Sequence, residues 1–505
     1  MRGIGLRGRE FFERLMISFS VSLVLLVVGY WIYGRYTEKV FGIDPERQTP
    51  AYSRMDKVDY VPLPGWRVFL IQFLNIAGLG PIFGAIMGAK FGASAYLWIV
   101  LGCIFAGAVH DYLSGMMSLR SGGISYPEII GQYMGKPFMQ VVRVFTPIMM
   151  ILVGTVFVAG PAGLLVSLTK ETLGFGFLTW ALIIFVYYVA ATLLPIDQVI
   201  GRLYPLFAAA LLFMAFGILF NLYWHMPVLP EVTDGLMNTH PEAATTPLFP
   251  MLFVTIACGA ISGFHATQSP MMARCMMNER QGRPIFFGAM IAEGVVALIW
   301  AAAANYAFHT PEGKAFFTSG NAALVVDFVS RNWLGTLGGA LAVLGVIAAP
   351  ITSGDTAFRS ARLIIADALR IDQKSLVKRL AVSLPLFVGS AALMFVDFNV
   401  IWRYFAWSNQ ILSTITLWAI SIYLVIHRKN FWITFIPALF MTAVVSAYLF
   451  VAPEMLGLNE TLSYGLSVLV MAVAGVFFVR YRNGLNAEAA KVKASAQTEM
   501  AAKGQ

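Results

Sequence analysis

Long apolar stretches separated by short polar segments run along almost the whole chain. Thirteen of these stretches approach the roughly 20 residues that an α-helix needs to cross a bilayer. The spans they predict are 15–33, 67–88, 92–113, 143–168, 177–194, 204–224, 249–270, 285–306, 335–354, 381–397, 403–426, 431–451 and 463–480. Lipid offers no hydrogen-bond partner to the backbone, and no stretch alternates like a barrel strand. The pattern therefore predicts an all-α protein with about thirteen transmembrane helices.

The composition agrees with this pattern, since 58% of the residues are hydrophobic and only 12% are charged. The net charge of +9 is distributed as the positive-inside rule requires, which favours membrane orientation over nucleic-acid binding. Segments 225–250 and 452–462 contain no Lys or Arg, whereas one segment is strongly basic. Its basic residues are Arg359, Arg362, Arg370, Lys374, Lys378 and Arg379. We expect a cytoplasmic C-terminus and, after thirteen crossings, an external N-terminus.

The second predicted span is built to interrupt its own helix. Between Asn75 and Pro81 it contains Gly78 and Gly80, which relax the backbone, and Pro81 suits the first turn of a new helical segment. Interrupting a helix in lipid leaves backbone groups that protein, water or a ligand must satisfy. Glycine also permits close helix packing in membranes, and that explanation stays open for this span.

The seventh predicted span repeats this feature at 258–270 and adds a high density of polar side chains. The expected orientations make the second and seventh spans inverted with respect to each other, five helices apart. Paired interruptions of this kind mark the binding site of many secondary transporters. We therefore expect a 5+5 inverted-repeat (LeuT-like) core whose repeats each begin with a broken helix. The predicted units are 1–66 (extra helix and loop), 67–224 (repeat 1), 249–426 (repeat 2), 431–480 (two accessory helices) and 486–505 (a disordered tail).

Ionisable residues inside a membrane are functional candidates, because burying a charge there is costly. Glu293 lies near the middle of the eighth span, so it must pair, face water or stay protonated. Proton coupling and a structural hydrogen bond are equally compatible with the pattern. His110 and Asp111 end the third span, where an interfacial cluster is the simpler interpretation.

The ninth span ends in a third candidate, the segment 349–356. Pro350 and Gly354 loosen the helix there, and hydroxyl and carboxylate oxygens suit a hard cation. In inverted-repeat transporters the third helix of repeat two supplies hydroxyls to a sodium ion. A solvated helix end is the alternative.

These arguments give two sets of candidate residues. The expected substrate-binding residues are Asn75, Gly78, Gly80, Gly259, Ser262, Gly263, His265, Thr267, Gln268 and Ser269. The expected residues for cation or proton coupling are Ala77, His110, Asp111, Glu293, Thr352, Ser353, Asp355 and Thr356. No metal is expected beyond a coupling Na+, and the coupling ion would be Na+ or H+. An enzyme is not favoured, since Ser262 with His265 is its only weak candidate for a nucleophile and base.

Four segments together also resemble one known family, the carbon starvation protein A family. They are Gln72 to Gly84, Gly107 to Asp111, Thr255 to His265 and Ala349 to Arg362, and the similarity extends over roughly residues 65–480. Longer members have a different sequence where this chain has Ala266 to Pro270. The family is grouped with the amino acid-polyamine-organocation transporters.

The resemblance implies an importer of the bacterial inner membrane that serves when nutrients run short. Its members take up peptides in some cases and pyruvate in others, so the expected partners are such a small molecule and the lipid bilayer, not nucleic acid. We expect secondary active uptake coupled to protons or sodium. A passive channel is the alternative from another class, and the sequence leaves the oligomeric state open.

Overall fold

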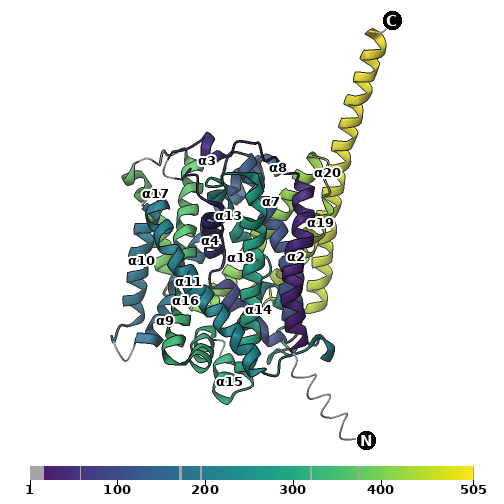
Figure 1. The fold of residues 1–505 in the computed structure, drawn as a ribbon. Coiled ribbons are helices and arrows are strands. Elements are labelled where there is room, and N and C mark those ends of the chain that lie inside the picture. Colours follow the sequence, from purple (N-terminus) through teal and green to yellow (C-terminus); the bar gives the residue numbers. More distant parts are fainter. Residues whose placement is uncertain are drawn as a thin grey trace, which may run out of the picture.

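The fold is known from a computed structural model, which describes residues 16–56, 59–169, 173–193, 196–318, 321–373 and 375–503. Its described part is a bundle of helices without a strand (Figure 1). Ten helices are long and apolar enough to cross a membrane, and a bent pair raises the number to eleven. The short apolar helix α10 (Phe177–Leu193) and the broken pair α12 and α13 occupy the two other predicted positions. The predicted all-α membrane fold is thus confirmed.

The helices of the first half follow one another as the apolar stretches predict. They are α2 (Ile17–Phe41), α3 (Pro50–Ser53), α4 (Gly65–Ile76), η1 (Gly80–Gly84), α5 (Ala85–Gly88), η2 (Ala89–Phe91), α6 (Ser94–Gly102), η3 (Cys103–Gly107), α7 (Ala108–Arg120), α8 (Tyr126–Met134), α9 (Lys136–Thr169), α10 and α11 (Ile196–His225). The elements η1 and η3 are π-helical turns inside longer helical runs.

The second half repeats this order of long helices and adds two more. Its helices are η4 (Val232–Asp234), α12 (Leu248–Thr255), α13 (Gly263–Ala273), η5 (Glu279–Gln281), η6 (Arg283–Gly288), α14 (Ala289–Phe308), α15 (Pro311–Thr318), α16 (Ala322–Leu369), α17 (Leu376–Leu393), α18 (Phe398–Ile426), α19 (Trp432–Val451) and α20 (Glu460–Lys503). Helix α16 packs on α9 and α11, while α19 and α20 pack on each other beside α18.

The two broken helices run in opposite directions. The segment that enters α4 meets the segment that leaves α13, because the Leu63 N–H donates to the Cys275 carbonyl at 3.0 Å. Helices α4 and α13 lie side by side in the same half of the bundle (Figure 1). The loop 226–247 covers the opposite end of the first broken helix, since the Thr239 hydroxyl donates to the Lys90 carbonyl at 2.9 Å. Each half therefore begins with a broken helix of inverted direction, as the sequence predicts.

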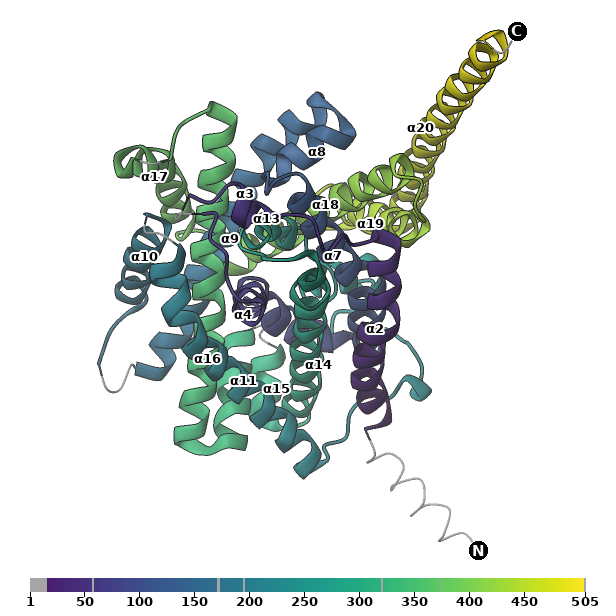
Figure 2. The same ribbon diagram turned by 45° about the horizontal axis from the view of Figure 1, so that its top comes forward.

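Helices α3 and α8 lie at one end of the bundle and α15 at the other, and α20 leaves at the α8 end (Figures 1 and 2). Helix α2 begins at the α15 end, so the first and last long helices start and finish at opposite ends. The predicted disordered tail is different in the structure, because α20 continues as one helix to Lys503. The Ala, Lys and Glu residues of this segment are strong helix formers. The remaining domain boundaries stay predictions.

Candidate functional site

The first helix break lies where the glycines and proline predict it. Helix α4 ends at Ile76, and Ala77 leaves the helical conformation with a ψ of 52°. The helical conformation resumes at Gly80. The two helical parts are bent by 53°. Pro81 occupies the first turn of the new segment, where its missing N–H costs nothing.

The second break spans the residues between Thr255 and Gly263, and α18 supplies its partners. The Asn409 side-chain oxygen accepts from the Phe264 N–H at 2.7 Å, and its amide donates to the Ser262 hydroxyl at 3.0 Å. The neighbouring Gln410 amide donates to the Ile261 carbonyl at 3.0 Å. Neither Asn409 nor Gln410 is among the predicted site residues, although two adjacent amides inside an apolar span are a sequence signal for such a role.

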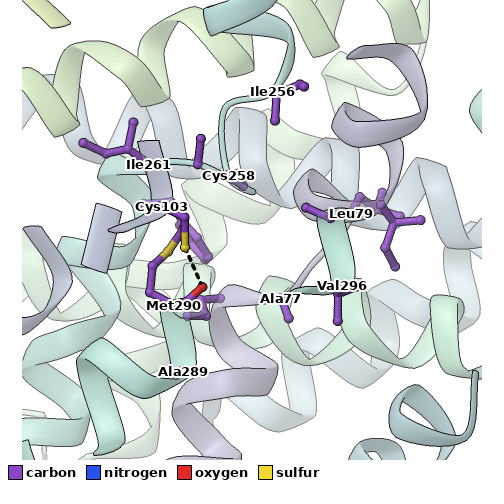
Figure 3. Packing of buried hydrophobic residues seen from close by; sticks show 14 of the residues in the cluster. Ala77, Leu79, Cys103, Ile256, Cys258, Ile261, Ala289, Met290 and Val296 are labelled. Carbon is purple, nitrogen blue, oxygen red and sulfur yellow. Dashed lines mark hydrogen bonds between the residues drawn. The ribbon is translucent and has the colours of Figure 1, made fainter. Parts of the chain in front are cut away.

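The two breaks touch each other at the centre of the bundle. A Cβ added to Gly80 would lie 2.3 Å from the Cys258 Cβ, far inside van der Waals contact. Figure 3 shows Ala77 and Leu79 of the first break and Cys258 and Ile261 of the second around one apolar core. The unwound segments therefore cross in direct contact.

Close packing explains the predicted substrate-binding glycines. A Cβ on Gly78 would meet the Ser353 hydroxyl at 3.0 Å, and one on Gly259 would meet the Ala297 Cβ at 2.6 Å. On Gly263 it would lie 2.4 Å from the Ser413 backbone nitrogen. Contact with a substrate stays a prediction for these glycines.

The structure joins three separately predicted candidates into one buried polar chain. The Asp111 carboxylate accepts from the His110 Nδ1 at 2.7 Å and from the His265 Nδ1 at 2.8 Å. The other ring nitrogen of His265 lies 3.4 Å from the Glu293 carboxyl group. All four side chains are fully buried. We call His110, Asp111, His265 and Glu293 the acid–histidine chain.

This arrangement corrects the interpretation of His110 and Asp111 as an interfacial cluster. Helix α7 continues for nine residues beyond Asp111, to Arg120, so the pair lies inside the bundle. A buried carboxylate is tolerated when two hydrogen-bond donors face it, and both histidines do so. Both Glu293 oxygens and the His110 Nε2 lack a hydrogen-bond partner within the described chain.

A second polar group holds α16 against the first break. The hydroxyls of Thr352 and Ser353 donate to the Leu74 carbonyl at 3.1 and 3.0 Å, and both also reach the Ala349 carbonyl. These oxygens converge one turn before the break at Ala77. The alternative of a solvated helix end does not apply here, because Thr352 and Ser353 are fully buried and α16 continues to Leu369. A coupling role for these two residues stays a prediction.

Asp355 and Thr356 do not join this group. The Asp355 carboxylate accepts from the Tyr187 hydroxyl of α10 at 2.8 Å, on another side of α16. The Thr356 hydroxyl donates to carbonyls of its own helix. The helical rotation turns Asp355 away from the break, and the coupling role of Asp355 and Thr356 stays a prediction.

The remaining predicted polar residues of the second break lie within α13 and are buried. The hydroxyls of Thr267 and Ser269 donate to carbonyls of their own helix, and Gln268 donates to Thr267 at 2.9 Å. Asn75 is likewise fully buried, beside the first break. The amide group of Gln72 and the Gln268 side-chain oxygen have no hydrogen-bond partner in the part of the chain that the structure describes.

A cavity of about 660 Å³ opens on the α15 side of the breaks. Its wall includes Phe83 of η1, Asn321 at the start of α16, and Asn399 and Trp402 of α18. A row of neighbouring aromatic rings leads from this wall to α13. Its members, each about 6 Å from the next, are Phe83, Trp402, Phe405, Phe157 and Phe264. The row thus connects the cavity wall to Phe264, which precedes His265 in the sequence.

Two inverted broken helices that enclose a buried polar centre define the LeuT-like class of transporter folds. A solved structure with this fold is that of MhsT in complex with L-phenylalanine. It superposes with a TM-score of 0.55 at 14% identity and covers 82% of this chain and 96% of that chain. At this identity the likeness concerns the fold alone.

The chain belongs to the carbon starvation protein CstA family, whose model matches residues 15–170, 162–310 and 301–447. An uncharacterized membrane protein of Haemophilus influenzae is 44% identical over 56% of this chain and 89% of its own length. The peptide transporter CstA of Bacillus subtilis is 30% identical over 56% of this chain and 57% of its own. The pyruvate/proton symporter BtsT of Escherichia coli is 28% identical over 60% and 52%. The chain thus aligns with little more than half the length of these two transporters.

Proposed function

We propose that this protein is a secondary active transporter that imports short peptides across the bacterial inner membrane by alternating access. The observation that carries the proposal is the contact between two inverted broken helices beside a fully buried acid–histidine chain. Such an arrangement costs stability in an inert membrane bundle, so a transport function accounts for it. The B. subtilis relative, a peptide transporter, supports the choice of substrate.

The acid–histidine chain is a suitable proton carrier. If the Asp111 carboxylate accepts from both histidine Nδ1 atoms, the His265 Nε2 faces Glu293 and one proton can lie between them. That proton can belong to His265 or to Glu293. The second carboxyl oxygen of Glu293 remains available for another hydrogen bond. Proton binding at this point would change the charge beside the break, which gives the substrate site a means of coupling.

The hydroxyls of Thr352 and Ser353 offer an alternative coupling site for Na+. With the carbonyls of Leu74 and Ala349 they place four oxygens together, and oxygen ligands suit a hard cation. A cation there would tie α16 to the first break.

The substrate carboxylate would bind at the N-terminal end of α13, where backbone N–H groups and the helix dipole favour an anion. In this conformation the Phe264 N–H donates to the Asn409 side-chain oxygen, which a substrate carboxylate would have to replace. The cavity on the α15 side is large enough for a dipeptide, and ligand pockets of roughly 300–1,000 Å³ hold small molecules.

A second candidate function is proton-coupled import of pyruvate. It is favoured by the pyruvate/proton symporter among the relatives and by the acid–histidine chain. An intramembrane hydrolase is disfavoured, because the Ser262 hydroxyl donates to Asn409 and the His265 Nε2 faces Glu293 instead of that hydroxyl. The two side chains therefore do not form a nucleophile and base.

Uptake into proteoliposomes tests the proposal. Labelled dialanine and labelled pyruvate would be offered in parallel under a proton gradient, a sodium gradient, both gradients or neither. We expect saturable, gradient-driven accumulation and counterflow of one substrate. Uptake that is unchanged when both gradients are collapsed would refute coupling, and uptake without saturation or counterflow would indicate a channel.

A further inference from the structure

Three arginine side chains are buried together at the end of the bundle where α4 begins and α13 ends. Arg359 and Arg362 of α16 are each 1% exposed, and Arg274, just after α13, is 6% exposed. Arginine is almost never fully buried unless a partner balances its charge. The partners of this group therefore decide what it does.

Among the residues that the structure describes, the carboxylate within ion-pair distance of this group is that of Asp59. Arg359 lies 3.6 Å from the Asp59 carboxylate and also donates to the Ala191 carbonyl. Arg274 donates to the Gly123 carbonyl and lies over the Tyr60 ring. The Ala191 and Gly123 carbonyls and the Tyr60 ring are all neutral.

Arg362 is the member of the group with the fewest partners. Its Nη1 donates to the neutral side-chain oxygen of Gln373 at 3.1 Å, while its Nε and Nη2 have no hydrogen-bond partner among the described residues. Arg359, Arg274 and Arg379 of α17 all repel its charge, and Asp59 attracts it. An exposed carboxylate, that of Asp367, also acts on Arg274. A buried guanidinium with two unused donors can bind the two oxygens of a carboxylate.

Asp59 connects this group to the first broken helix. It lies in the short segment that leads into α4, and the segment is tied to the end of α13 by the Leu63 and Cys275 backbone groups. The Asp59 carboxylate is 12% exposed, so it lies at the entrance to the arginines. The Asp59 carboxylate is thus an anion of the protein itself that lies against these arginines.

We propose that Arg359 and Arg362 form a carboxylate-binding site that Asp59 closes in this conformation. The inference rests on the proposed transport function: the ligand is the carboxylate of the imported substrate as it leaves toward the side of the membrane where α13 ends. Substrate and Asp59 compete for the guanidinium of Arg359, while the unused donors of Arg362 are open to the substrate. Binding of substrate releases Asp59, and the segment 59–64 then separates from α16.

Labelling of Cys275 tests this exchange without requiring transport. The thiol is buried beneath the segment 59–64, and its sulfur lies 3.9 Å from the Asp59 carbonyl. In the purified full-length protein, a maleimide would be added with dialanine, pyruvate, inorganic phosphate or no ligand, and labelled Cys275 would be quantified by mass spectrometry. We expect dialanine or pyruvate to accelerate labelling about tenfold, the ratio that about 1.4 kcal/mol produces.

The variants separate binding from a structural role of the arginines. Asp59→Asn should accelerate labelling without any ligand. Arg362→Gln and Arg362→Lys should both lose the response to carboxylates, because glutamine removes the charge and lysine lacks the planar fork. Lys378→Gln removes an exposed charge at the same end of the bundle and should respond like the wild type. Equal carboxylate responses in the wild type and both Arg362 variants, or a response to phosphate alone, would overturn the proposal.

Efflux from vesicles of known orientation supplies the second measurement. Arg362→Gln should raise the KM at the arginine-bearing face about tenfold and leave the KM at the opposite face unchanged. An unchanged KM at both faces contradicts the carboxylate site, whereas wild-type vesicles that transport neither substrate contradict the proposed function. The two failures are therefore distinguishable.

Discussion

The contact between the two broken helices predicts that Gly80→Ala destabilises the protein. Gly80 has no positive φ, so its backbone accepts alanine and no conformational strain arises. The new Cβ would lie 2.3 Å from the Cys258 Cβ, whereas carbon atoms pack at about 3.5–4.0 Å. The two segments must therefore separate by more than 1 Å, and overpacking of this kind costs about 1–3 kcal/mol.

A paired substitution on the opposite segment makes this prediction specific. Cys258→Gly removes the Cβ that the new methyl group meets, so Gly80→Ala with Cys258→Gly should recover about 1 kcal/mol or more of the lost stability. Gly80→Ala with Cys258→Ala is the matched control, because this second substitution removes the sulfur and keeps the clashing Cβ. Gly465→Ala, on the α20 surface with no atom within 4 Å, should be neutral or slightly stabilising.

Thermal unfolding of the detergent-solubilised variants, followed by size-exclusion chromatography, measures these effects. Unfolding would be recorded for the two single variants, the double variant and both controls at one protein concentration. The reasoning is refuted if Gly80→Ala unfolds like the wild type. It is equally refuted if Cys258→Ala rescues stability as well as Cys258→Gly does, since the clash would then lie with the sulfur.

Three further substitutions test the polar centre. Asn409→Ala leaves the Phe264 N–H unsatisfied and should cost about 1–3 kcal/mol in thermal unfolding, against no loss for the exposed amide in Asn483→Ala. Asp111→Asn removes the charge that both histidines face, so we expect proton-driven uptake to fall at least tenfold while a stably folded protein remains; full proton-driven uptake would exclude a role in coupling. Thr352→Val removes one of two hydroxyls that face the first break; a sodium-coupled protein should then require about tenfold more Na+ for half-maximal uptake, and a sodium requirement equal to that of the wild type would exclude the site.

The helix breaks could be predicted from sequence because their causes are local. Gly78, Gly80 and Pro81 interrupt a helix wherever they occur together in an apolar run, and the structure bends there. The inverted direction of the second break followed from counting crossings and basic loops. Both arguments depend on neighbouring residues or on the order of spans, which a sequence records directly.

The acid–histidine chain could not be assembled from sequence, because its members come from three helices. Each of His110, His265 and Glu293 is recognisable as a polar residue in an apolar span, but their mutual contacts depend on how α7, α13 and α14 pack. The partners of the second break were missed for the same reason. Asn409 lies 147 residues beyond Ser262 and belongs to another helix, α18.

The end of the ninth span was misplaced because an apolar run stops at its first charges, although the helix does not. Asp355 and Arg359 ended the predicted span, yet α16 continues to Leu369 with both side chains buried. Their partners include the Tyr187 hydroxyl and the Ala191 carbonyl, both on α10. Charges that find partners on a neighbouring helix stay inside the bundle, and a hydropathy pattern does not register those partners.

Because α16 continues past Asp355, this one helix contacts the first broken helix and the segment before it at two separate places. Ser353 contacts the Leu74 carbonyl beside the break, and Arg359 contacts Asp59 before α4 begins. The two contacts lie almost two helical turns apart on α16, about 9 Å along its axis. Moving α4 away from α16 requires both to be released. A cation that binds at Ser353 and a carboxylate that displaces Asp59 would therefore act in opposite senses on the same movement, the first holding α4 in place and the second freeing it. This opposition provides a physical route by which release of the coupling ion and exit of the substrate toward one side of the membrane become parts of a single opening step.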